Sequence, residues 1–526
     1  MADYYHLVSK AKSNLLVLIR FSTIIKIIGI LFLVWFLFFS LPSELFKAPK
    51  SRAIYDRNGH LLFASVAEDG QWRFPKIDSV SIKVEKCVTL YEDEYFFYHL
   101  GINPISILKS FFLNLKSGDI KRGGSTITMQ TIRILQQNPK RTYWQKIKEI
   151  ILALRFELFN SKNTILEYYV SNAPYGGNIV GIEAASWRYF GKSSQLLSWA
   201  EAATLAVLPN QPSYIYPGKN QELLLKKRNK LLKKLLENKE IDALDYQLAL
   251  EERLPSHIFS IPSYSYHLAQ EIDDESSYGI VNTTIDYQVQ RKVMDVLEMY
   301  HIGYKSNQIN NLAAIVIDAN NGEIIAYVGN TSDSVGGNKI NMITRPRSSG
   351  STLKPLLYAN MLDDGLITSS SLIQDIPIDI NGYEPNNSSY KFDGLIPANQ
   401  ALSRSLNIPW ILSLKKYGYD RFYKKLQDCG FSHFTKPARH YGLSLVVGGG
   451  EIELQELADV FLLMSNKLKD QNLNLKSSFI RDKYNYANDP MDMSRGAIWL
   501  TFEALTNVAR PENEENWQYR QSQKIA

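Results

Sequence analysis

The feature that most constrains how this chain can fold is an uncharged apolar segment close to its N-terminus. The run IIGILFLVWFLFF, residues 27–39, follows several basic residues and, with its apolar neighbours, approaches the about 20 residues that cross a bilayer. Basic flanks stay cytoplasmic, and the following SLPSELFKAPK offers no Ala-x-Ala cleavage site. We therefore predict a cytoplasmic tail at 1–23 and an uncleaved, single-pass transmembrane anchor at 24–43. The anchor would lie in the cytoplasmic (inner) membrane, with an extracytoplasmic, periplasmic body.

The rest of the chain is too long for one ordinary hydrophobic core. Its 526 residues suggest two or three domains, and 45% hydrophobic against 21% charged residues are typical of a globular protein. The formal net charge of +6 favours anionic partners such as phospholipid headgroups or a pyrophosphate, but it is too diffuse to indicate nucleic acid. Cys87 and Cys429 lie far apart and lack metal-ligand spacing, so we expect neither a disulfide framework nor a metal site.

The pattern along the chain changes once, and this predicts the domain organisation. Residues 50–255 are mostly helical in pattern. Polar and turn residues then predict a linker at 256–290. After it, LAAIVIDANNGEIIAYVGN predicts a β-hairpin around an Asn-Asn-Gly turn, which places a mixed α+β domain at 291–526.

Two helical segments of the first domain lead to specific expectations. RTYWQKIKEIILALRFELF predicts an amphipathic helix, followed by a second helix that Ser161 caps. Its apolar face is expected to consist of Ile147, Ile151, Leu154 and Leu158. The basic segment QELLLKKRNKLLKKLLENKEID, from residue 221, is interpreted as a solvated helix at a domain edge.

Three short patches of the first domain carry candidate chemistry. YEDEYFFYHLGI sets Glu92 and two further acids against aromatic residues, and KRGGSTITMQ combines two glycines with Ser125 and Thr126, a composition that suits anion binding. Lys146 and Glu149 are three residues apart and share a helix face. Taken singly, each patch is more often an ordinary helix start or a surface ion pair.

The order of these patches resembles the family 51 peptidoglycan glycosyltransferases at each of their signatures. The matching stretches are YEDEYFFYHLGI, RGGSTITMQ, RTYWQKIKE, SKNTILEYYV with YGGNIVGIEAASWRYFGK, and EAATLAVLPNQPS. Met129 and the run SNAPYGGN are most similar to the penicillin-binding protein 1C subgroup. The resemblance implies a mainly α, lysozyme-like glycosyltransferase domain that polymerises lipid II.

The resemblance also implies a role for individual residues. Glu92 would be the catalytic base and Glu149 a second carboxylate, and direct attack by the acceptor would invert the anomeric carbon. The lipid pyrophosphate would be bound by Ser125, Thr126, Arg133, Arg141 and Lys146, and Gln130 would be a further substrate-binding residue. No cofactor is required, although a divalent cation such as Mg²⁺ is compatible with the site. Residues 105–115 predict a helix that either dips into the outer leaflet or packs in the core.

The second domain has its own set of candidate catalytic residues. RSSGSTLKPLLY places Ser351 and Lys354 one helical turn apart, so that an amine can take the proton of a hydroxyl, and SRSLNIPW adds Ser405 and Asn407. With GLSLVVGGGEIELQELADVFLLMSN, these motifs resemble the class A bifunctional penicillin-binding proteins, whose transpeptidase domain has a β-lactamase-like fold. The implied reaction is transfer of a D-Ala-D-Ala stem peptide through an acyl-Ser351. The implied partners are lipid II, the growing glycan strand, stem peptides, β-lactam antibiotics and inner-membrane lipid.

One signature of that family is missing after Asn407. No Lys-Ser/Thr-Gly follows, and KSG at 116–118 stands in the first domain. In relatives a similar segment runs into a WKTGTS strand, so we expect a C-terminally truncated transpeptidase domain. Two functions stay open: a bifunctional cell-wall polymerase, or a monofunctional glycosyltransferase whose second domain only binds peptides or partner proteins. A noncatalytic membrane scaffold is a third reading, which would require every signature to be a relic.

Overall fold

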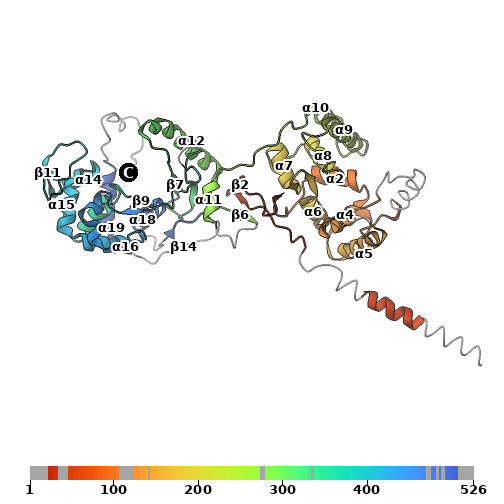
Figure 1. Cartoon of the computed structure of the whole chain (residues 1–526), viewed down its shortest axis with the longest axis horizontal. Coiled ribbons are helices and arrows are strands. Elements are labelled where there is room, and N and C mark those ends of the chain that lie inside the picture. Colours follow the sequence, from red (N-terminus) through yellow and green to blue (C-terminus); the bar gives the residue numbers. More distant parts are fainter. Residues whose placement is uncertain are drawn as a thin grey trace, which may run out of the picture. The chain divides into compact units, whose positions relative to one another are not determined.

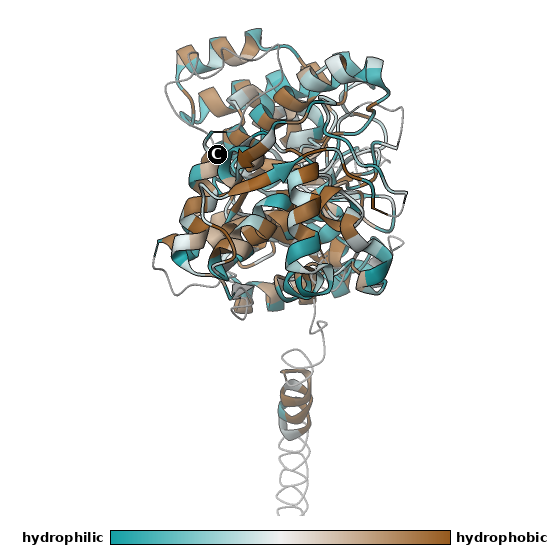
Figure 2. Cartoon of the chain, turned by 90° about the vertical axis from the view of Figure 1, so that its left-hand side faces the viewer, coloured by the Kyte–Doolittle hydropathy of each residue, from teal (hydrophilic) through white to brown (hydrophobic). Residues whose placement is uncertain are grey.

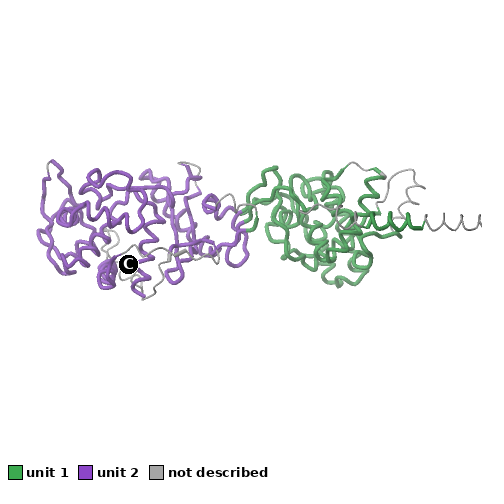
Figure 3. The backbone as a smooth tube through the Cα atoms, turned by 90° about the horizontal axis from the view of Figure 1, so that it is seen from below, with its two compact units in different colours: residues 1–53, 64–262, 274–280 green, residues 54–63, 263–273, 281–526 purple. Residues whose placement is uncertain are grey.

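The computed structural model arranges the chain in two compact units (Figures 1 and 3). Unit 1 comprises Met1–Ala53, Ala64–Pro262 and Asp274–Ile280, and unit 2 comprises Ile54–Phe63, Ser263–Asp273 and Val281–Ala526. The structure describes residues 22–33, 45–105, 124–139, 142–272, 279–332, 337–380, 382–469, 475–480, 485–486 and 492–507.

The described part of the predicted anchor is helical. Residues 22–33 form a helix with exposed side chains, most of them hydrophobic (Figure 2). Within the described ranges, no helix combines the length and the apolarity needed to cross a bilayer. Residues 1–21 of the tail predicted at 1–23 and residues 34–43 of the predicted anchor lie outside the described residues, while residues 22 and 23 of that tail belong to the helix.

Unit 1 is mainly helical, as predicted. Its helices are α2 (Ile82–Glu92), α4 (Ile127–Leu135), α5 (Tyr143–Phe159), α6 (Lys162–Asn172), α7 (Ile182–Phe190), α8 (Trp199–Ala206), α9 (Gln221–Glu237) and α10 (Ala243–Glu251). A small sheet has the order β3 (Trp72–Arg73), β5 (Ile179–Val180), β4 (Pro174–Gly176). The helix α2 packs against α8 and α9, and α4 packs against α5 and α6. The contact with α8 is close because its buried face consists largely of alanine.

Side-chain caps start these helices where the sequence predicts them. Ser161 accepts a hydrogen bond from Thr164 N at the start of α6, as expected, and Thr142 caps α5. The expected apolar face of α5 was wrong: Ile147 and Leu158 are exposed, and the buried stripe contains Glu149 instead. Because the helix carries apolar residues on two faces, periodicity alone did not identify the packed one.

Unit 2 mixes helices and short strands. Its helices are α11 (Tyr266–Glu271), α12 (Tyr287–Tyr304), α13 (Lys354–Asp363), α14 (Ala398–Ser403), α15 (Ile408–Tyr417), α16 (Tyr419–Asp428), α17 (Ala438–Tyr441), α18 (Leu454–Leu468) and α19 (Arg495–Leu505). Its paired strands are β7 (Ala314–Ile317) with β8 (Ile324–Val328), β9 (Arg347–Ser348) with β12 (Glu451–Ile452), β10 (Leu372–Asp375) with β11 (Gly394–Pro397), and β13 (Leu475–Lys476) with β14 (Asn485–Tyr486). The predicted hairpin is β7–β8, in which Ile315 pairs with Tyr327.

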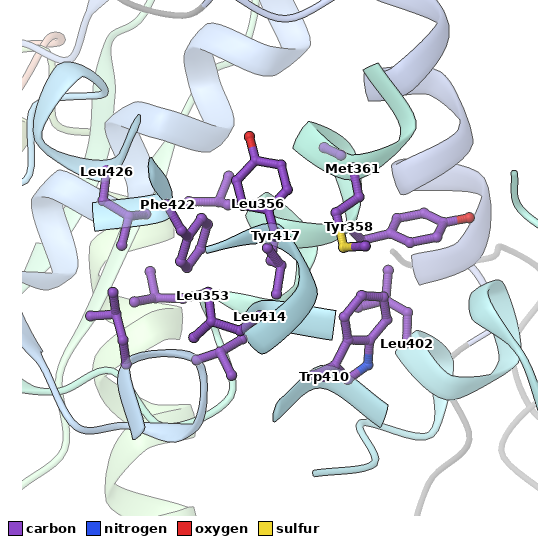
Figure 4. Close-up of a cluster of buried hydrophobic side chains, with 14 of the residues drawn as sticks. Leu353, Leu356, Tyr358, Met361, Leu402, Trp410, Leu414, Tyr417, Phe422 and Leu426 are labelled. Atoms are coloured by element: carbon purple, nitrogen blue, oxygen red, sulfur yellow. The ribbon is translucent and has the colours of Figure 1, made fainter. Parts of the chain in front are cut away.

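The main core of unit 2 lies around α13 and α15. Trp410 is fully buried there and meets Tyr358 edge to face, with ring centroids 5.7 Å apart (Figure 4). Leu353, Leu356 and Leu414 fill the same cluster. This core therefore includes Leu353, the residue before Lys354. The burial of Leu353 holds the start of α13 in place.

The boundary between the units differs from the predicted one. The hairpin of β1 (Ala53–Tyr55) and β2 (Leu61–Ala64) lies between two segments of unit 1 in the sequence, yet residues 54–63 belong to unit 2, where β1 also pairs with β6 (Ile280–Asn282). Ile54 and Leu62 are buried in a second core with Ile324. Some residues of the predicted domain at 50–255 and of the predicted linker at 256–290 thus belong to unit 2. The sequence did not indicate this, because the residues that pack around Ile54 and Leu62 are distant in sequence.

Candidate active sites

The first site begins where α2 ends. Glu92 is the last residue of α2, and the next residue, Asp93, is buried. The Asp93 carboxylate accepts a hydrogen bond from Ile127 N at 3.1 Å and lies 3.0 Å from His99 Nε2. Asp93 therefore ties the end of α2 to the start of α4, and this fixes the position of Glu92 relative to α4.

The Glu92 carboxylate is held by one of its two oxygens. Glu92 Oε2 accepts a hydrogen bond from Gln130 Nε2 of α4 at 2.7 Å, while the buried Oε1 has no hydrogen-bond partner in the described part of the chain. Burial raises the pKa of Glu92, whereas the hydrogen bond from Gln130 and the positive charges of Arg133 and Lys227 oppose this rise. A carboxylate that has a raised pKa and an oxygen without a hydrogen-bond partner can accept a proton from a hydroxyl group.

Thr126 has a structural role beside this carboxylate. It caps α4 by accepting a hydrogen bond from Met129 N, and its hydroxyl donates to Gly101 O at 2.6 Å. A hydroxyl has one proton to donate. Since the Thr126 proton is donated to Gly101 O, it is not available to a pyrophosphate, contrary to the prediction. Gly101 has φ +79°, and a Cβ there would lie 2.8 Å from Ala153 O of α5, which explains the glycine at this position.

Ser125, Lys146 and Glu149 come together as one group. Lys146 Nζ donates to Ser125 Oγ at 2.7 Å and to Glu149 Oε2 at 3.2 Å. Ser125 Oγ accepts this bond and keeps its own proton for another acceptor. Because Ser125 lies just before α4 and Gln130 lies within it, this group and Glu92 are both positioned by α4. The arrangement offers a cation and a hydroxyl donor to an anion.

The helix α9 contributes a lysine that the sequence analysis did not single out. Lys227 Nζ donates to Asn210 Oδ1 at 3.2 Å and to Gln211 Oε1 at 3.1 Å, and its charge lowers the pKa of Glu92. The helix α9 buries a leucine stripe that also contains Arg228, and this stripe packs against α2. Lys227 stands next to that stripe, a signal that could have placed it near α2.

Two predicted features of the first site lie outside the described residues. These are Arg141 and residues 106–115 of the predicted membrane-facing helix. Arg133 lies in the last turn of α4, where its charge acts on Glu92.

The second site is centred on Lys354, the first residue of α13. Its side chain is 1% exposed, and Nζ donates to Ser405 O at 2.8 Å, to Asn407 Oδ1 at 2.8 Å and to Ser405 Oγ at 3.3 Å. Burial lowers the pKa of Lys354 to about 8. The structure therefore brings together three of the four predicted residues, around an amine that is partly neutral close to neutral pH.

Ser351 lies on the turn that leads into α13. Its carbonyl accepts a hydrogen bond from Lys354 N at 3.1 Å, while its half-buried hydroxyl is not among the partners of Lys354 Nζ. The glycines that follow Val447 pack against this turn, since Ser349 N donates to Gly450 O at 3.0 Å. At Gly448, with φ +109°, a Cβ would lie 2.7 Å from Ser348 Oγ, so the close approach requires glycine.

Comparison with known proteins identifies both halves. Residues 59–236 match the transglycosylase family, and residues 312–449 match the penicillin binding protein transpeptidase domain. The chain therefore matches a transglycosylase domain and a penicillin-binding transpeptidase domain, in that order. Glu92 and Ser351 each lie inside the corresponding match.

Among curated proteins, the chain is 32% identical to penicillin-binding protein 1C of Escherichia coli strain K12, over 89% of this chain and 60% of that protein. It is 28% identical to penicillin-binding protein 1A of Streptococcus pneumoniae strain R6, over 76% of this chain and 59% of the relative. The chain thus spans about three fifths of the length of these relatives. A crystal structure of penicillin-binding protein 1A from Haemophilus influenzae shares 18% identity, with a TM-score of 0.49, over 91% of this chain and 84% of that one.

One group of side chains in the described part of the chain combines residue types that can bind a metal ion. His433, Glu453 and Glu456 have ligand atoms within 4.8 Å of one another. They are separated in sequence, so spacing did not reveal them. His433 Nε2 lies 2.6 Å from Glu453 Oε1, and Glu456 Oε1 accepts a hydrogen bond from Ser432 Oγ. These groups therefore satisfy one another without an ion.

Proposed function

We propose that unit 1 polymerises lipid II into glycan strands by inverting glycosyl transfer. Glu92 accepts the proton of the acceptor sugar's 4-hydroxyl as that oxygen attacks the donor's anomeric carbon, and the lipid pyrophosphate leaves with the bonding electron pair. The observation that carries this proposal is the buried, unpartnered Oε1 of a Glu92 whose pKa is raised by burial. A single base with direct attack converts an α-linked donor into a β-linked glycan.

The leaving pyrophosphate would bind beside α4. Lys146 and the Ser125 hydroxyl supply a cation and a donor there, Arg133 adds positive charge, and Arg141 is proposed to join them. Gln130 holds Glu92 in place. Glu149 fixes the Lys146 ammonium, so the chain itself supplies positive charge at this point. We propose no cofactor requirement and derive no step from Mg²⁺.

We propose that unit 2 cross-links stem peptides by acyl transfer. Ser351 Oγ attacks the D-Ala-D-Ala carbonyl, its proton passes to the neutral Lys354 amine, the terminal D-Ala leaves as the amine, and a neighbouring stem-peptide amine then displaces Ser351. The Ser405 hydroxyl, 3.3 Å from Lys354 Nζ, is in position to relay the proton. A β-lactam would acylate the same serine. The buried Lys354 with its lowered pKa favours catalysis over a domain that only binds peptides.

The proposed location follows from the substrates and from the N-terminal segment. Lipid II and the growing glycan strand belong at the outer face of the inner membrane, where a single-pass anchor would hold the periplasmic body. The uncharged run at 27–39 supports this placement, and inner-membrane lipid is the proposed second partner. Nucleic acid is not a proposed partner.

The test for unit 1 is Glu92→Gln, with Glu94→Gln as its matched control. Glu94 lies two residues away and is exposed, with its carboxylate 2.7 Å from Lys234 Nζ. We expect Glu92→Gln to slow lipid II polymerisation by about 10²-fold or more without lowering the unfolding midpoint, and Glu94→Gln to retain activity. Glycan chains made by Glu92→Gln at the wild-type rate would remove Glu92 from the mechanism.

A further inference from the structure

A buried polar network lies behind the loop that carries Ser405 and Asn407. Asp375, at the end of β10, is 0% exposed, and Asn387 is 1% exposed. Asn387 Nδ2 donates to Asp375 Oδ1 at 2.8 Å and to Lys391 O at 2.9 Å, while Asp375 Oδ2 accepts from Asp393 N at 2.9 Å. Neither Asp375 nor Asn387 belongs to a motif that the sequence analysis identified.

The network reaches the active site through the amide oxygen of Asn387. This oxygen accepts hydrogen bonds from Asn407 N at 2.8 Å and from Ile408 N at 3.2 Å, at the start of α15. The Asn407 side chain donates from Nδ2 to Asn386 O at 2.9 Å, which leaves its Oδ1 directed at Lys354 Nζ. A continuous set of hydrogen bonds thus connects the buried Asp375 carboxylate to the Lys354 amine.

The loop needs such support because its backbone is strained. Ser405 has φ +51°, a left-handed conformation that residues other than glycine rarely adopt. Arg404, immediately before it, pairs with the carboxylate of Asp393, whose N–H donates to Asp375. The Asp375 carboxylate is therefore connected to both ends of the loop, through Asp393 at Arg404 and through Asn387 at Asn407.

We propose that Asp375 and Asn387 are positioning residues for acyl transfer, which hold Asn407 and the Ser405 backbone so that Lys354 faces the reacting hydroxyl. This inference rests on the proposed acyl transfer at Ser351. The Asn387 amide cannot turn over: its oxygen faces two N–H donors and its nitrogen faces a carboxylate. A displaced loop would misdirect the Lys354 amine, although Asp375 and Asn387 do not contact the substrate.

The experiment exchanges the two groups. Asn387→Asp sets two carboxylates against each other, and Asp375→Asn sets an amide nitrogen against either Asn387 Nδ2 or Asp393 N. The double variant restores the donor–acceptor pair between these two positions, because the amide introduced at position 375 donates to the carboxylate introduced at position 387 and accepts from Asp393 N. Only Lys391 O still lacks its donor, as it does in Asn387→Asp. We expect each single variant to be acylated by a fluorescent penicillin about 10²-fold more slowly, and the double variant to be faster than either.

The matched control is Gln290→Glu. Gln290 is a buried amide of unit 2 that accepts from Tyr327 N at 2.8 Å and donates to Tyr264 O and Tyr327 O, in a different core from Lys354. This variant should lose stability while its folded fraction is acylated at the wild-type rate. Single variants that are acylated at the wild-type rate, or a control that slows equally, would overturn the positioning role.

A second readout separates this proposal from the proposed function. Cyanate carbamylates accessible neutral amines, and mass spectrometry locates the product on Lys354. Faster modification in the single variants, with protection regained in the double variant, supports the network even if the wild-type chain takes up no penicillin, a result that would count against acyl transfer alone. Equal protection of Lys354 in all the proteins would overturn the network.

Discussion

Three neighbouring acids, Glu92, Asp93 and Glu94, have three different environments. Glu92 keeps one oxygen without a partner, Asp93 is buried against His99, and Glu94 pairs with Lys234 on the surface. The sequence predicted that this acidic cluster was unusual, but the residues alone did not rank its members. The partners that separate them come from α4 and α9, which are distant in sequence.

Lys354 should give acyl transfer a characteristic pH dependence. Burial holds its pKa at about 8, and only the neutral amine can accept the Ser351 proton. Labelling by a fluorescent penicillin should therefore fall about tenfold per pH unit below pH 8 and level off above it. In the unfolded chain the pKa of this lysine is its ordinary value of about 10.4. Between pH 8 and that value the unfolded chain binds the proton and the folded chain does not, so the stability of unit 2 should rise as the pH rises from about 8 to about 10.4. Labelling rates that do not change between pH 6 and 9 would contradict this role.

Gly101→Ala should destabilise unit 1. Its φ of +79° and the 2.8 Å approach of a Cβ to Ala153 O and Glu157 Cγ both oppose a side chain, so we expect a loss of about 1–3 kcal/mol. Gly70→Ala is the control, since Gly70 has φ +75° but open space around a Cβ. Chemical denaturation of both variants separates the clash from the backbone strain, and equal losses would show that the contact with α5 does not matter.

At the scale of elements, the sequence predicted where helices and strands occur better than it predicted which face of a helix is buried. The caps of α6 and the β7–β8 hairpin are where residue type and turn chemistry placed them. The packed face of α5 was not predicted correctly, and no packed face was predicted for α9. In both helices a charged residue, Glu149 or Arg228, occupies the buried stripe, and hydrophobic periodicity counts such a residue as surface.

The helix α9 should tune the glycosyltransferase site through Lys227. Since the charge of Lys227 lowers the pKa of Glu92, Lys227→Met should raise that pKa. A base with a higher pKa is ionised only at higher pH, so the acid limb of polymerisation activity should move to higher pH. Lys230→Met, an exposed position on the same helix, should leave the profile unchanged. Identical profiles for Lys227→Met and the wild type would detach α9 from the site.

At the scale of the whole molecule, two domains in the right order followed from the sequence, but their boundary did not. The motifs fixed the identity of each half because their chemistry is local. The hairpin at 54–63 belongs to unit 2 through contacts with residues that come much later, such as the bonds from Arg57 to Thr284 O and Glu323. Such long-range pairing leaves no periodic signal near residue 54.

Asp56→Ala should destabilise unit 2, although Asp56 lies between two segments of unit 1 in the chain. Its buried carboxylate accepts hydrogen bonds from Asn58 N and His60 N, each at 2.7 Å, and from Tyr287 N of α12 at 3.2 Å. Losing these bonds should cost about 3 kcal/mol. Hydrogen exchange should show faster opening around α12 and unchanged protection of α4. Asp69→Ala, which removes an ion pair with Arg73 in unit 1, is the control.

The early position of this hairpin also sets an order of events during synthesis. Residues 54–63 leave the ribosome before residues 64–262 of unit 1, while their partners at 281–526 emerge only after unit 1 is complete. Unit 1 can therefore fold first, as N-terminal domains generally do. Until unit 2 folds, apolar residues of the hairpin such as Ile54 and Leu62, which are buried in the folded protein, stay exposed. A slow or interrupted translation of the second half would prolong that exposure, so the hairpin is the segment where a chaperone would be needed most.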